Sequence, residues 1–290
     1  MEGKALELNI LIAIQKISSS FFDAIFIFLT QFGEIRTFAV LLPIVYWCMD
    51  KGLGERLFIS LFASSYTNGF IKGLVVRPRP IGQNGVRTIY SDSATSSSFP
   101  SGHSQSSASF FGVAAFYKGI KKWWWLLIIP VLTGVSRLYL GVHWPTDVLA
   151  GLLIGAAIAL IVNFAMKLSK KATLIALPVI CAVLLVFTKG AEHLADCLLM
   201  LGLLLGASIG ILIENSFIDF TTHDVKLLHR LLRIPVGLIA VAIPTAIIAL
   251  PLWLLGVSPT GDYALAGLAC CVAFSATVLA PLSFRALRLE

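Results

Sequence analysis

Long apolar runs, separated by short polar or charged segments, make up most of this chain. Ten runs are candidates for membrane-spanning helices: residues 18–33, 36–49, 56–76, 102–118, 122–140, 146–166, 172–188, 194–214, 233–255 and 262–284. A spanning helix needs about 20 apolar residues, so the first two runs are short and are expected to be tilted or partly interfacial. Residues 5–16 have mixed polarity and predict an interfacial helix. The pattern therefore predicts an all-α protein with about eight to ten transmembrane helices.

The composition supports a membrane protein rather than a soluble one. Of the 290 residues, 58% are hydrophobic and 13% are charged, whereas soluble domains carry roughly 25% charged residues. The basic residues behind the net charge of +7 stand singly between apolar runs, which argues against nucleic acid as a partner. The five cysteines have no metal-ligand spacing and are expected to be small buried side chains. The expected architecture is a polytopic integral membrane helical bundle.

The basic residues are divided unevenly between the two sides of such a bundle. With ten spans, 15 of the 22 lysines and arginines fall on one side, among them Lys4, Lys16 and Lys170, and seven fall on the other. Cytoplasmic loops carry the excess of basic residues. The side with seven, which includes Lys72 and Arg137, is therefore expected to face away from the cytoplasm. The membrane is most simply the cell membrane.

The most unusual stretch is residues 136–147, Ser-Arg-Leu-Tyr-Leu-Gly-Val-His-Trp-Pro-Thr-Asp, between two apolar runs. Ionisable residues at a membrane boundary are costly and are usually kept for function. Pro145 suits the first turn of a helix, which would put Asp147 where the helix dipole favours a negative charge. His143 stands four residues earlier, and a carboxylate that fixes the tautomer of an imidazole prepares it to act as a nucleophile or base.

A second stretch suits an anionic ligand. Residues 100–103 are Pro-Ser-Gly-His, directly before an apolar run. Ser101 is a good N-cap, and Gly102 allows another group to approach the backbone closely. The N–H groups at the start of the new helix would form an anion site.

Basic residues from two other places would complete this site. Lys72 and Arg79 are seven residues apart, nearly two helical turns, and are expected on one face of a helix that the prolines of Arg77-Pro78-Arg79-Pro80 bring to an end. Together with Arg137 they give three fixed cations. Combined with Pro-Ser-Gly-His, they predict a pocket for a phosphate-sized anion.

These three stretches form a signature. Its parts are Lys72 with six residues before Arg79-Pro80, Pro100-Ser101-Gly102-His103, and Ser136-Arg137 with five residues before His143 and three more before Asp147. The set resembles the signature of the type 2 phosphatidic acid phosphatases, the lipid phosphate phosphatases of the superfamily shared with vanadium haloperoxidases. The parts are complete, in order and at the family spacing. The resemblance covers roughly residues 20–165.

The resemblance implies an enzyme that cleaves a lipid phosphate through a phosphohistidine. His143 would attack phosphorus, Asp147 would hold its ring, and His103 would protonate the leaving oxygen and then activate water. The residues implied in binding the phosphate are Lys72, Arg79, Ser101, Gly102 and Arg137. Neither a metal nor another cofactor is expected, because the three cations balance the phosphate charge.

Several questions stay open at this level. The substrate would be a lipid phosphate or diphosphate such as undecaprenyl diphosphate, phosphatidylglycerophosphate, phosphatidate or a sphingoid phosphate. One alternative is a phosphotransferase that uses the same intermediate. Another is a protein that binds or transports a phosphorylated lipid without catalysis, although binding alone needs no pair of histidines.

The rest of the chain adds organisation rather than chemistry. Residues 1–170 would form a membrane-embedded phosphatase core of six helices, and residues 171–290 would add further transmembrane helices. Gly202, Gly206 and Gly210 are spaced by four, which predicts close helix packing within this chain or with a second copy in a homodimer. The polar connection between Pro80 and Pro100 is either a flexible loop or a lid over the lipid head group.

Overall fold

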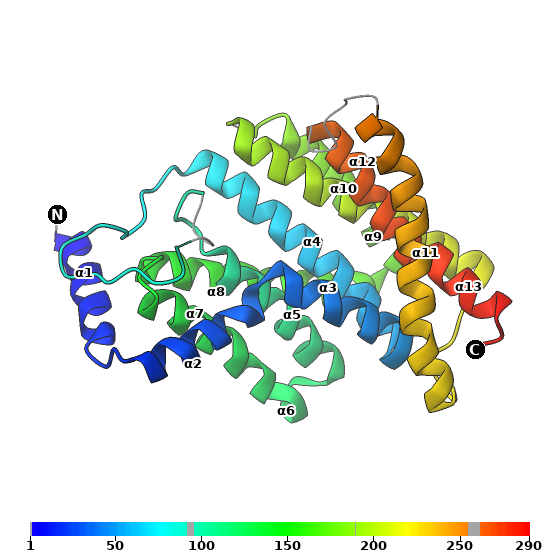
Figure 1. Ribbon diagram of the computed structural model, residues 1–290, viewed down its shortest axis with the longest axis horizontal. Helices are drawn as coiled ribbons and strands as arrows, with labels where there is room; N and C mark the ends of the chain where they lie inside the picture. Colours follow the sequence, from blue (N-terminus) through cyan, green and yellow to red (C-terminus); the bar gives the residue numbers. More distant parts are fainter. Residues whose placement is uncertain (1, 92–95, 189, 255–261) are drawn as a thin grey trace. The chain divides into compact units, whose positions relative to one another are not determined.

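The computed structural model describes residues 2–91, 96–188, 190–254 and 262–290, and every regular element in these ranges is a helix (Figure 1). The α-helices are α1 (Glu2–Gln15), α2 (Ser20–Thr30), α3 (Ile35–Pro43), α4 (Lys51–Leu74), α5 (Gly102–Lys118), α6 (Ile120–Trp123), α7 (Ile128–Tyr139), α8 (Pro145–Leu168), α9 (Lys170–Leu185), α10 (Ala191–Ile213), α11 (Leu227–Leu254), α12 (Asp262–Phe274) and α13 (Ala280–Ala286). The predicted all-α class is confirmed, and each of the ten predicted runs coincides with one or more of these helices.

Within the part of the chain that the structure describes, length and apolar composition mark four helical stretches as able to cross a membrane. They are Pro145–Leu168, His193–Ile218, Leu227–Pro251 and Tyr263–Ala286. A fifth is obtained if α1 and α2, which meet at a bend of 117°, count as one broken span. Other helices are shorter or more charged: α4 has 24 residues but carries a lysine at each end. The protein is thus an integral membrane helical protein, and the total of eight to ten spans stays a prediction.

The chain forms two compact units, each made of two segments. Unit 1 consists of Met1–Phe38 and Thr67–Ile161, and unit 2 consists of Ala39–Tyr66 and Val162–Glu290. All the residues of the phosphatase signature belong to unit 1. The sequence predicts a boundary at residue 170 between a phosphatase core and additional C-terminal helices. That boundary stays a prediction.

Glycines allow the helices of unit 1 to pack backbone against backbone around the signature. A Cβ on Gly151 of α8 would lie 2.5 Å from the carbonyl oxygen of Ser101, and one on Gly155 would overlap the carbonyl oxygen of Gln105 in α5. This close approach lets the N–H of Ser101 donate to the carbonyl oxygen of Asp147 at 3.0 Å. The second and third parts of the signature are therefore joined by a backbone hydrogen bond.

The glycine stripe of unit 2 packs in the same manner. Cβ atoms on Gly202 and Gly206 of α10 would overlap the backbone of α12 at Ala266 and Cys270, and one on Gly210 would overlap Thr277. The predicted close packing is confirmed, and it occurs within this chain. The homodimer stays a prediction, and the stripe no longer argues for it.

Helix α1 lies at the end of unit 1 that carries the signature. Near its start Glu7 accepts a hydrogen bond from Arg77, and at its end the side chain of Gln15 donates to the carbonyl oxygen of Tyr139. Because α1 runs along this end, the prediction that Lys4 and Lys16 lie on the opposite side of the membrane is wrong. Moving these two residues changes the division of the 22 basic residues from 15 and seven to 13 and nine.

Candidate active site

His143 and Asp147 lie where the sequence predicts them: His143 just before a helix, and Asp147 in the first turn of that helix. Helix α8 begins at Pro145, with Asp147 as the acidic residue of the first turn. His143 Nδ1 is 3.5 Å from Asp147 Oδ2, which is too long for a strong hydrogen bond. The two side chains are 2% and 0% exposed, so the carboxylate acts on the ring in a dry, low-dielectric setting where charge effects are strong.

Asp147 accepts hydrogen bonds from three donors. Its Oδ2 accepts from Ser98 Oγ at 2.5 Å and from the backbone N–H of Trp144 at 2.8 Å. Its Oδ1 accepts from Arg77 Nη1 at 2.7 Å. A buried carboxylate is tolerated only when it is paired and hydrogen-bonded in this manner.

The other ring nitrogen of His143 faces a cation. His143 Nε2 is 3.1 Å from Arg79 Nη1, and the same guanidinium donates to the carbonyl oxygens of Ser96 at 2.8 Å and Val142 at 2.9 Å. Burial, followed by the nearby positive charges of Arg137 and Arg79, lowers the pKa of His143 well below its ordinary value. The imidazole is therefore neutral at physiological pH, which is the form that a nucleophile needs.

Lys72 and Arg79 reach the site by a different route from the predicted one. Helix α4 ends at Leu74, so the two residues do not share a helix face, and that prediction is wrong. The helix stops early because each proline of Arg77-Pro78-Arg79-Pro80 biases the residue before it toward extended backbone. Lys72 still meets the arginine, because its ammonium donates to Ser96 Oγ at 2.8 Å while Arg79 binds the carbonyl oxygen of the same serine.

Ser101 is the N-cap residue of α5, as predicted, but its hydroxyl does not cap the helix. It accepts from Ser104 Oγ at 2.9 Å and is completely buried. Its own hydroxyl hydrogen is therefore available for another acceptor. Gly102 follows as the first residue of α5, where the backbone N–H groups have no partner within the helix.

His103 is paired with a carboxylate that sequence reasoning missed. Its Nε2 lies 3.0 Å from Glu34 Oε1. A Cβ on Gly33 would lie 2.7 Å from the Cβ and the carbonyl oxygen of His103, so only glycine lets the turn before α3 come this near. The hydrogen bond from His103 lowers the pKa of Glu34 despite partial burial, so the carboxylate is ionised.

Arg137 lies in the last turn of α7, where the helix dipole favours a cation. It is completely buried, and its Nη1 donates to Thr30 Oγ1 at 2.9 Å. The positive charges that act on His143 come from Arg137, Arg79, Lys72 and His103, in decreasing order of effect. The signature residues therefore form one electrostatic site within unit 1, although they come from three separate stretches of the chain.

Three residues of this site carried a weak signal in the sequence. Arg77 belongs to the doubled Arg-Pro, Ser98 ends a run of serines, and Glu34 is an acid between two apolar runs. None of them is part of the three-part signature. Within the polar connection between Pro80 and Pro100, residues 96–98 contact the site, whereas residues 92–95 lie outside the described residues, so the lid stays a prediction.

Known proteins share this arrangement of sequence and fold. Residues 55–173 match the PAP2 superfamily, and residues 198–290 match the transmembrane extension of PAP2 superfamily phosphatases. Undecaprenyl-diphosphatase BcrC of Bacillus subtilis is 30% identical over 148 residues, which cover 50% of this chain and 74% of that protein. The undecaprenyl-diphosphatase of Sulfolobus acidocaldarius is 29% identical over 47% of this chain and 67% of that protein.

One solved structure supports the fold. The crystal structure of Aquifex aeolicus LpxE superposes with a TM-score of 0.50 and 23% identity, over 55% of this chain and 94% of that chain. The family match and the phosphatases among the relatives make this chain a membrane phosphatase by class. The chain belongs to the PAP2 superfamily. The resemblance to the lipid phosphate phosphatases and the prediction of an enzyme of that class are confirmed.

Proposed function

We propose that this chain hydrolyses a lipid phosphate or diphosphate through a phosphohistidine intermediate on His143. The observation that carries the proposal is the setting of His143: a neutral, buried imidazole with Asp147 behind one nitrogen and Arg79 in front of the other. A neutral nitrogen beside a cation can attack a phosphorus atom whose oxygens the same cation binds.

In the first step His143 Nε2 forms a bond to phosphorus, and the bond between phosphorus and the leaving oxygen breaks. His103 transfers a proton to that oxygen, so that the lipid alcohol or lipid monophosphate leaves in neutral or protonated form. In the second step His103 takes a proton from water, the water oxygen bonds to phosphorus, and the bond between phosphorus and nitrogen breaks. Inorganic phosphate leaves and both histidines return to their starting states.

Asp147 and Glu34 have parallel roles in this scheme. Each carboxylate lies beside one histidine and favours the protonated ring that forms during turnover: His143 becomes positively charged on phosphorylation, and His103 does so when it activates water. Glu34 thus acts through His103 as a positioning residue and does not touch the substrate.

The phosphoryl oxygens would be bound by Lys72, Arg79 and Arg137, by the hydroxyl of Ser101 and by the N–H of Gly102. A Cβ on Gly102 would come 3.3 Å from Asn68 Oδ1, which is tight without a direct overlap. Packing against protein alone therefore does not demand glycine, and close approach of a ligand to the backbone gives a better reason.

For the lipid, a polyprenyl diphosphate is our first candidate. Two relatives are undecaprenyl-diphosphatases, which supports a diphosphate head group. Phosphatidylglycerophosphate, phosphatidate and a sphingoid phosphate complete the panel. All of them present a terminal phosphoryl group, but the leaving group is a lipid monophosphate for the diphosphate and an alcohol for the others, so the panel tests the tail and the leaving group.

The site would face away from the cytoplasm. After Lys4 and Lys16 are moved, the predicted topology assigns nine basic residues to the side of the site, and Lys72, Arg79 and Arg137 among them would serve the phosphate rather than topology. Single cysteines at Asn84 and Lys170, in a background without native cysteines, would test this with an impermeant thiol reagent on intact cells. Labelling at position 170 but not at 84 would place the site in the cytoplasm.

The test of the function is phosphate release by purified protein in detergent from each lipid of the panel, compared by kcat/KM, with EDTA and with added magnesium. We expect turnover in EDTA and acid-labile phosphate on His143 after a rapid quench. Loss of activity in EDTA that magnesium restores would contradict the metal-free mechanism. Transfer to another alcohol without release of inorganic phosphate would make the enzyme a phosphotransferase.

A further inference from the structure

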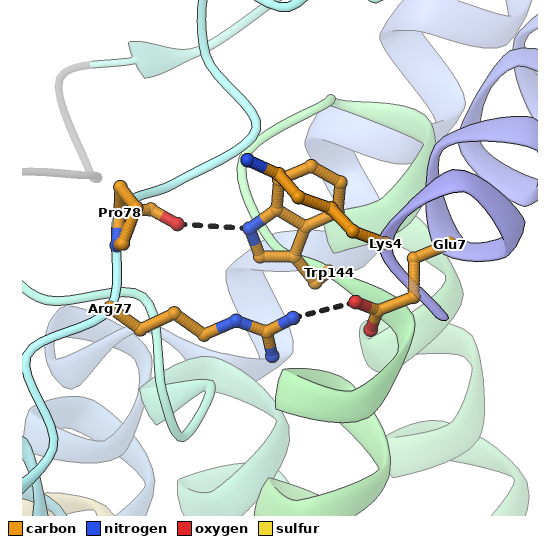
Figure 2. A pocket seen from close by; sticks show the side chains of 5 residues that line it. All are labelled: Lys4, Glu7, Arg77, Pro78 and Trp144. Atoms are coloured by element: carbon orange, nitrogen blue, oxygen red, sulfur yellow. Dashed lines mark hydrogen bonds and ion pairs between the residues drawn. The ribbon is translucent and has the colours of Figure 1, made fainter. Parts of the chain in front are cut away.

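A cavity lies in unit 1 beside the candidate active site, and Arg77 belongs to both. It has a volume of about 330 Å³ and is lined by Lys4, Glu7, Arg77, Pro78 and Trp144 (Figure 2). Small-molecule pockets span roughly 300–1,000 Å³, so this one has room for a head group and not for a whole lipid. The mechanism proposed above does not use it.

The walls of this cavity are fixed by hydrogen bonds. Trp144 is 2% exposed, and its indole N–H donates to the carbonyl oxygen of Pro78 at 2.9 Å (Figure 2). Arg77 Nη2 donates to Glu7 Oε2 at 2.6 Å. The other oxygen of Glu7 accepts from the backbone N–H of Thr146 at 3.1 Å and from its hydroxyl at 2.6 Å. The acceptors of Glu7 are therefore engaged by the protein itself.

Two cations line the cavity around the indole ring. Lys4 Nζ lies 5.8 Å from the centre of the Trp144 ring, and Arg77 Cζ lies 5.6 Å from it. Among the side chains that the structure describes from Gly3 onward, no carboxylate lies within ion-pair distance of Lys4, whereas Arg77 pairs with Glu7 and Asp147. A guanidinium has five N–H donors, and the hydrogen bonds of Arg77 engage three of them: two on Nη1 and one on Nη2.

We propose that this cavity is a second site for a phosphate group, in which the ammonium of Lys4 and the remaining donors of Arg77 bind the oxygens and the indole of Trp144 packs against the carbon atoms attached to them. The ligand chemistry is a tetrahedral phosphate oxyanion. Its source is either the phosphodiester of an anionic phospholipid in the bilayer or free inorganic phosphate.

Arg77 connects this site to the catalytic pair. Its Nη1 binds Asp147 Oδ1 at 2.7 Å, and Asp147 Oδ2 faces His143. A phosphate group that draws the guanidinium toward Lys4 weakens its hold on Asp147, so occupancy changes turnover. The binding itself does not depend on the proposed function, whereas the effect on turnover rests on it.

The binding test reads out Lys4 directly. Wild-type protein in nanodiscs of phosphatidylcholine, with or without phosphatidylglycerol, is treated with an amine-modifying reagent, and the rates at Lys4 and Lys16 are compared by mass spectrometry. We expect phosphatidylglycerol to slow modification of Lys4 about tenfold and to leave Lys16, which directly follows the same helix, unchanged. Equal slowing at both lysines would mean adsorption to a charged surface and would overturn the proposal.

A second arm separates the two sources. Inorganic phosphate is added to phosphatidylcholine nanodiscs: protection of Lys4 there, but not by phosphatidylglycerol, assigns the site to free phosphate. Protection by neither overturns it. Turnover of a prenyl diphosphate is then measured against phosphatidylglycerol content for the wild type, Lys4→Gln and the matched control Lys16→Gln. If turnover no longer responds to phosphatidylglycerol only in Lys4→Gln, the link through Arg77 is supported. If turnover of Lys4→Gln still responds, the link is rejected. The labelling result does not depend on either outcome.

Discussion

The two units each bury charged side chains, but with different balance. In unit 1 the site combines four cations, Lys72, Arg77, Arg79 and Arg137, with the carboxylates of Asp147 and Glu34. In unit 2, Lys51 pairs with Glu214 at 2.8 Å and Lys170 pairs with Glu55 at 2.6 Å. With Glu7, which pairs with Arg77, the first group has three carboxylates, and positive charge still exceeds negative charge by one. In the second group the two buried carboxylates are matched by the two lysines, and the exposed Asp219 is a second partner of Lys51.

The matched group is also closed by its own hydrogen bonds. Glu55 Oε1 accepts from Asn215 Nδ2 at 2.7 Å, and Glu214 Oε1 accepts from the backbone N–H of Phe220 at 2.9 Å. Both carboxylates are completely buried. These contacts join the starts of α4 and α9 to the end of α10, all within unit 2.

The difference separates a structural group from a site. A buried ion pair with equal charges has little to offer a ligand, and removing one partner costs stability. An excess of buried positive charge is unfavourable without an anion, so it indicates the place of one. Both groups are buried, so burial of charge alone does not distinguish a ligand site from a structural group. The excess of positive charge does, and it occurs in unit 1.

The largest expected effect is in unit 1, at the two histidines. His143→Ala removes the nucleophile, so no phosphoenzyme should form with any substrate, and turnover should fall by at least about 10⁴-fold. His103→Ala removes the leaving-group acid, a loss of about 10²–10⁴-fold with a lipid phosphate. An activated aryl phosphate needs no such proton and should partly restore phosphorylation in the His103 variant only.

The measurement is acid-labile radiolabel on the protein after a rapid quench, followed by peptide mapping. Because hydrolysis of the phosphoenzyme also needs His103, label should accumulate on His143 in the His103→Ala variant. Label on His103, or equal rescue of both variants, would mean that the two roles are exchanged.

The next effect tests the excess of positive charge itself. Arg79→Gln removes the cation in front of His143 Nε2, and kcat should fall about 10²–10³-fold, as for loss of one donor to a developing charge. Arg87→Gln is the matched control, because Arg87 is a half-exposed arginine of the same unit that pairs with Asp23. A loss no greater than that of Arg87→Gln would show that the charge of Arg79 is not used in turnover.

Much of this site could be predicted from the sequence, because its parts are local. Pro145 and Asp147 are two residues apart, and the chemistry of a helix start is enough to place both. Ser101 and Gly102 were placed at a helix start for the same reason. The positions of the apolar runs predicted the helices equally well, because the length and composition of a run decide whether it forms a membrane helix.

What failed depends on contacts between distant segments. Glu34 meets His103 only because Gly33 lets two stretches approach, and no local pattern reports such a contact. Lys72 and Arg79 were assigned to one helix from their spacing, although the prolines already argued that the helix would stop. Counting spans along the sequence puts Lys4 on the cytoplasmic side. The structure instead bends between α1 and α2, and α1 contacts Arg77 at the end of unit 1 that carries the signature.

A smaller effect concerns the carboxylate beside His103. Glu34→Gln keeps the shape and removes the charge, and the pKa of Glu34 is lowered by its bond to His103, so the charge is present throughout the working range of pH. A carboxylate favours the protonated imidazole. Without it the acid form of His103 is lost at lower pH, and the alkaline limb of kcat/KM should move down by about one pH unit.

The readout for Glu34 is the full pH profile with a lipid phosphate and with the activated aryl phosphate. The shift should be seen in kcat/KM for the lipid phosphate and nearly vanish for the aryl phosphate, whose leaving group needs no acid. A uniform drop with an unmoved profile would indicate that Glu34 only supports the fold.

The smallest effect on turnover is expected in the matched group of unit 2. Glu55→Gln keeps an acceptor for Asn215 and breaks the ion pair with Lys170, whose side chain is 38% exposed and can turn toward water. The cost should therefore be about 1–2 kcal/mol in the free energy of unfolding, below the roughly 3–5 kcal/mol of a fully buried pair. Thermal unfolding in detergent should show it, while kcat/KM of the folded fraction stays within about twofold. The double variant Glu55→Gln with Lys170→Gln removes the unpaired ammonium and should recover part of the loss. If instead Glu55→Gln lowered kcat/KM more than about tenfold at unchanged stability, a balanced group would be acting in catalysis, and charge balance would not distinguish the site from the scaffold.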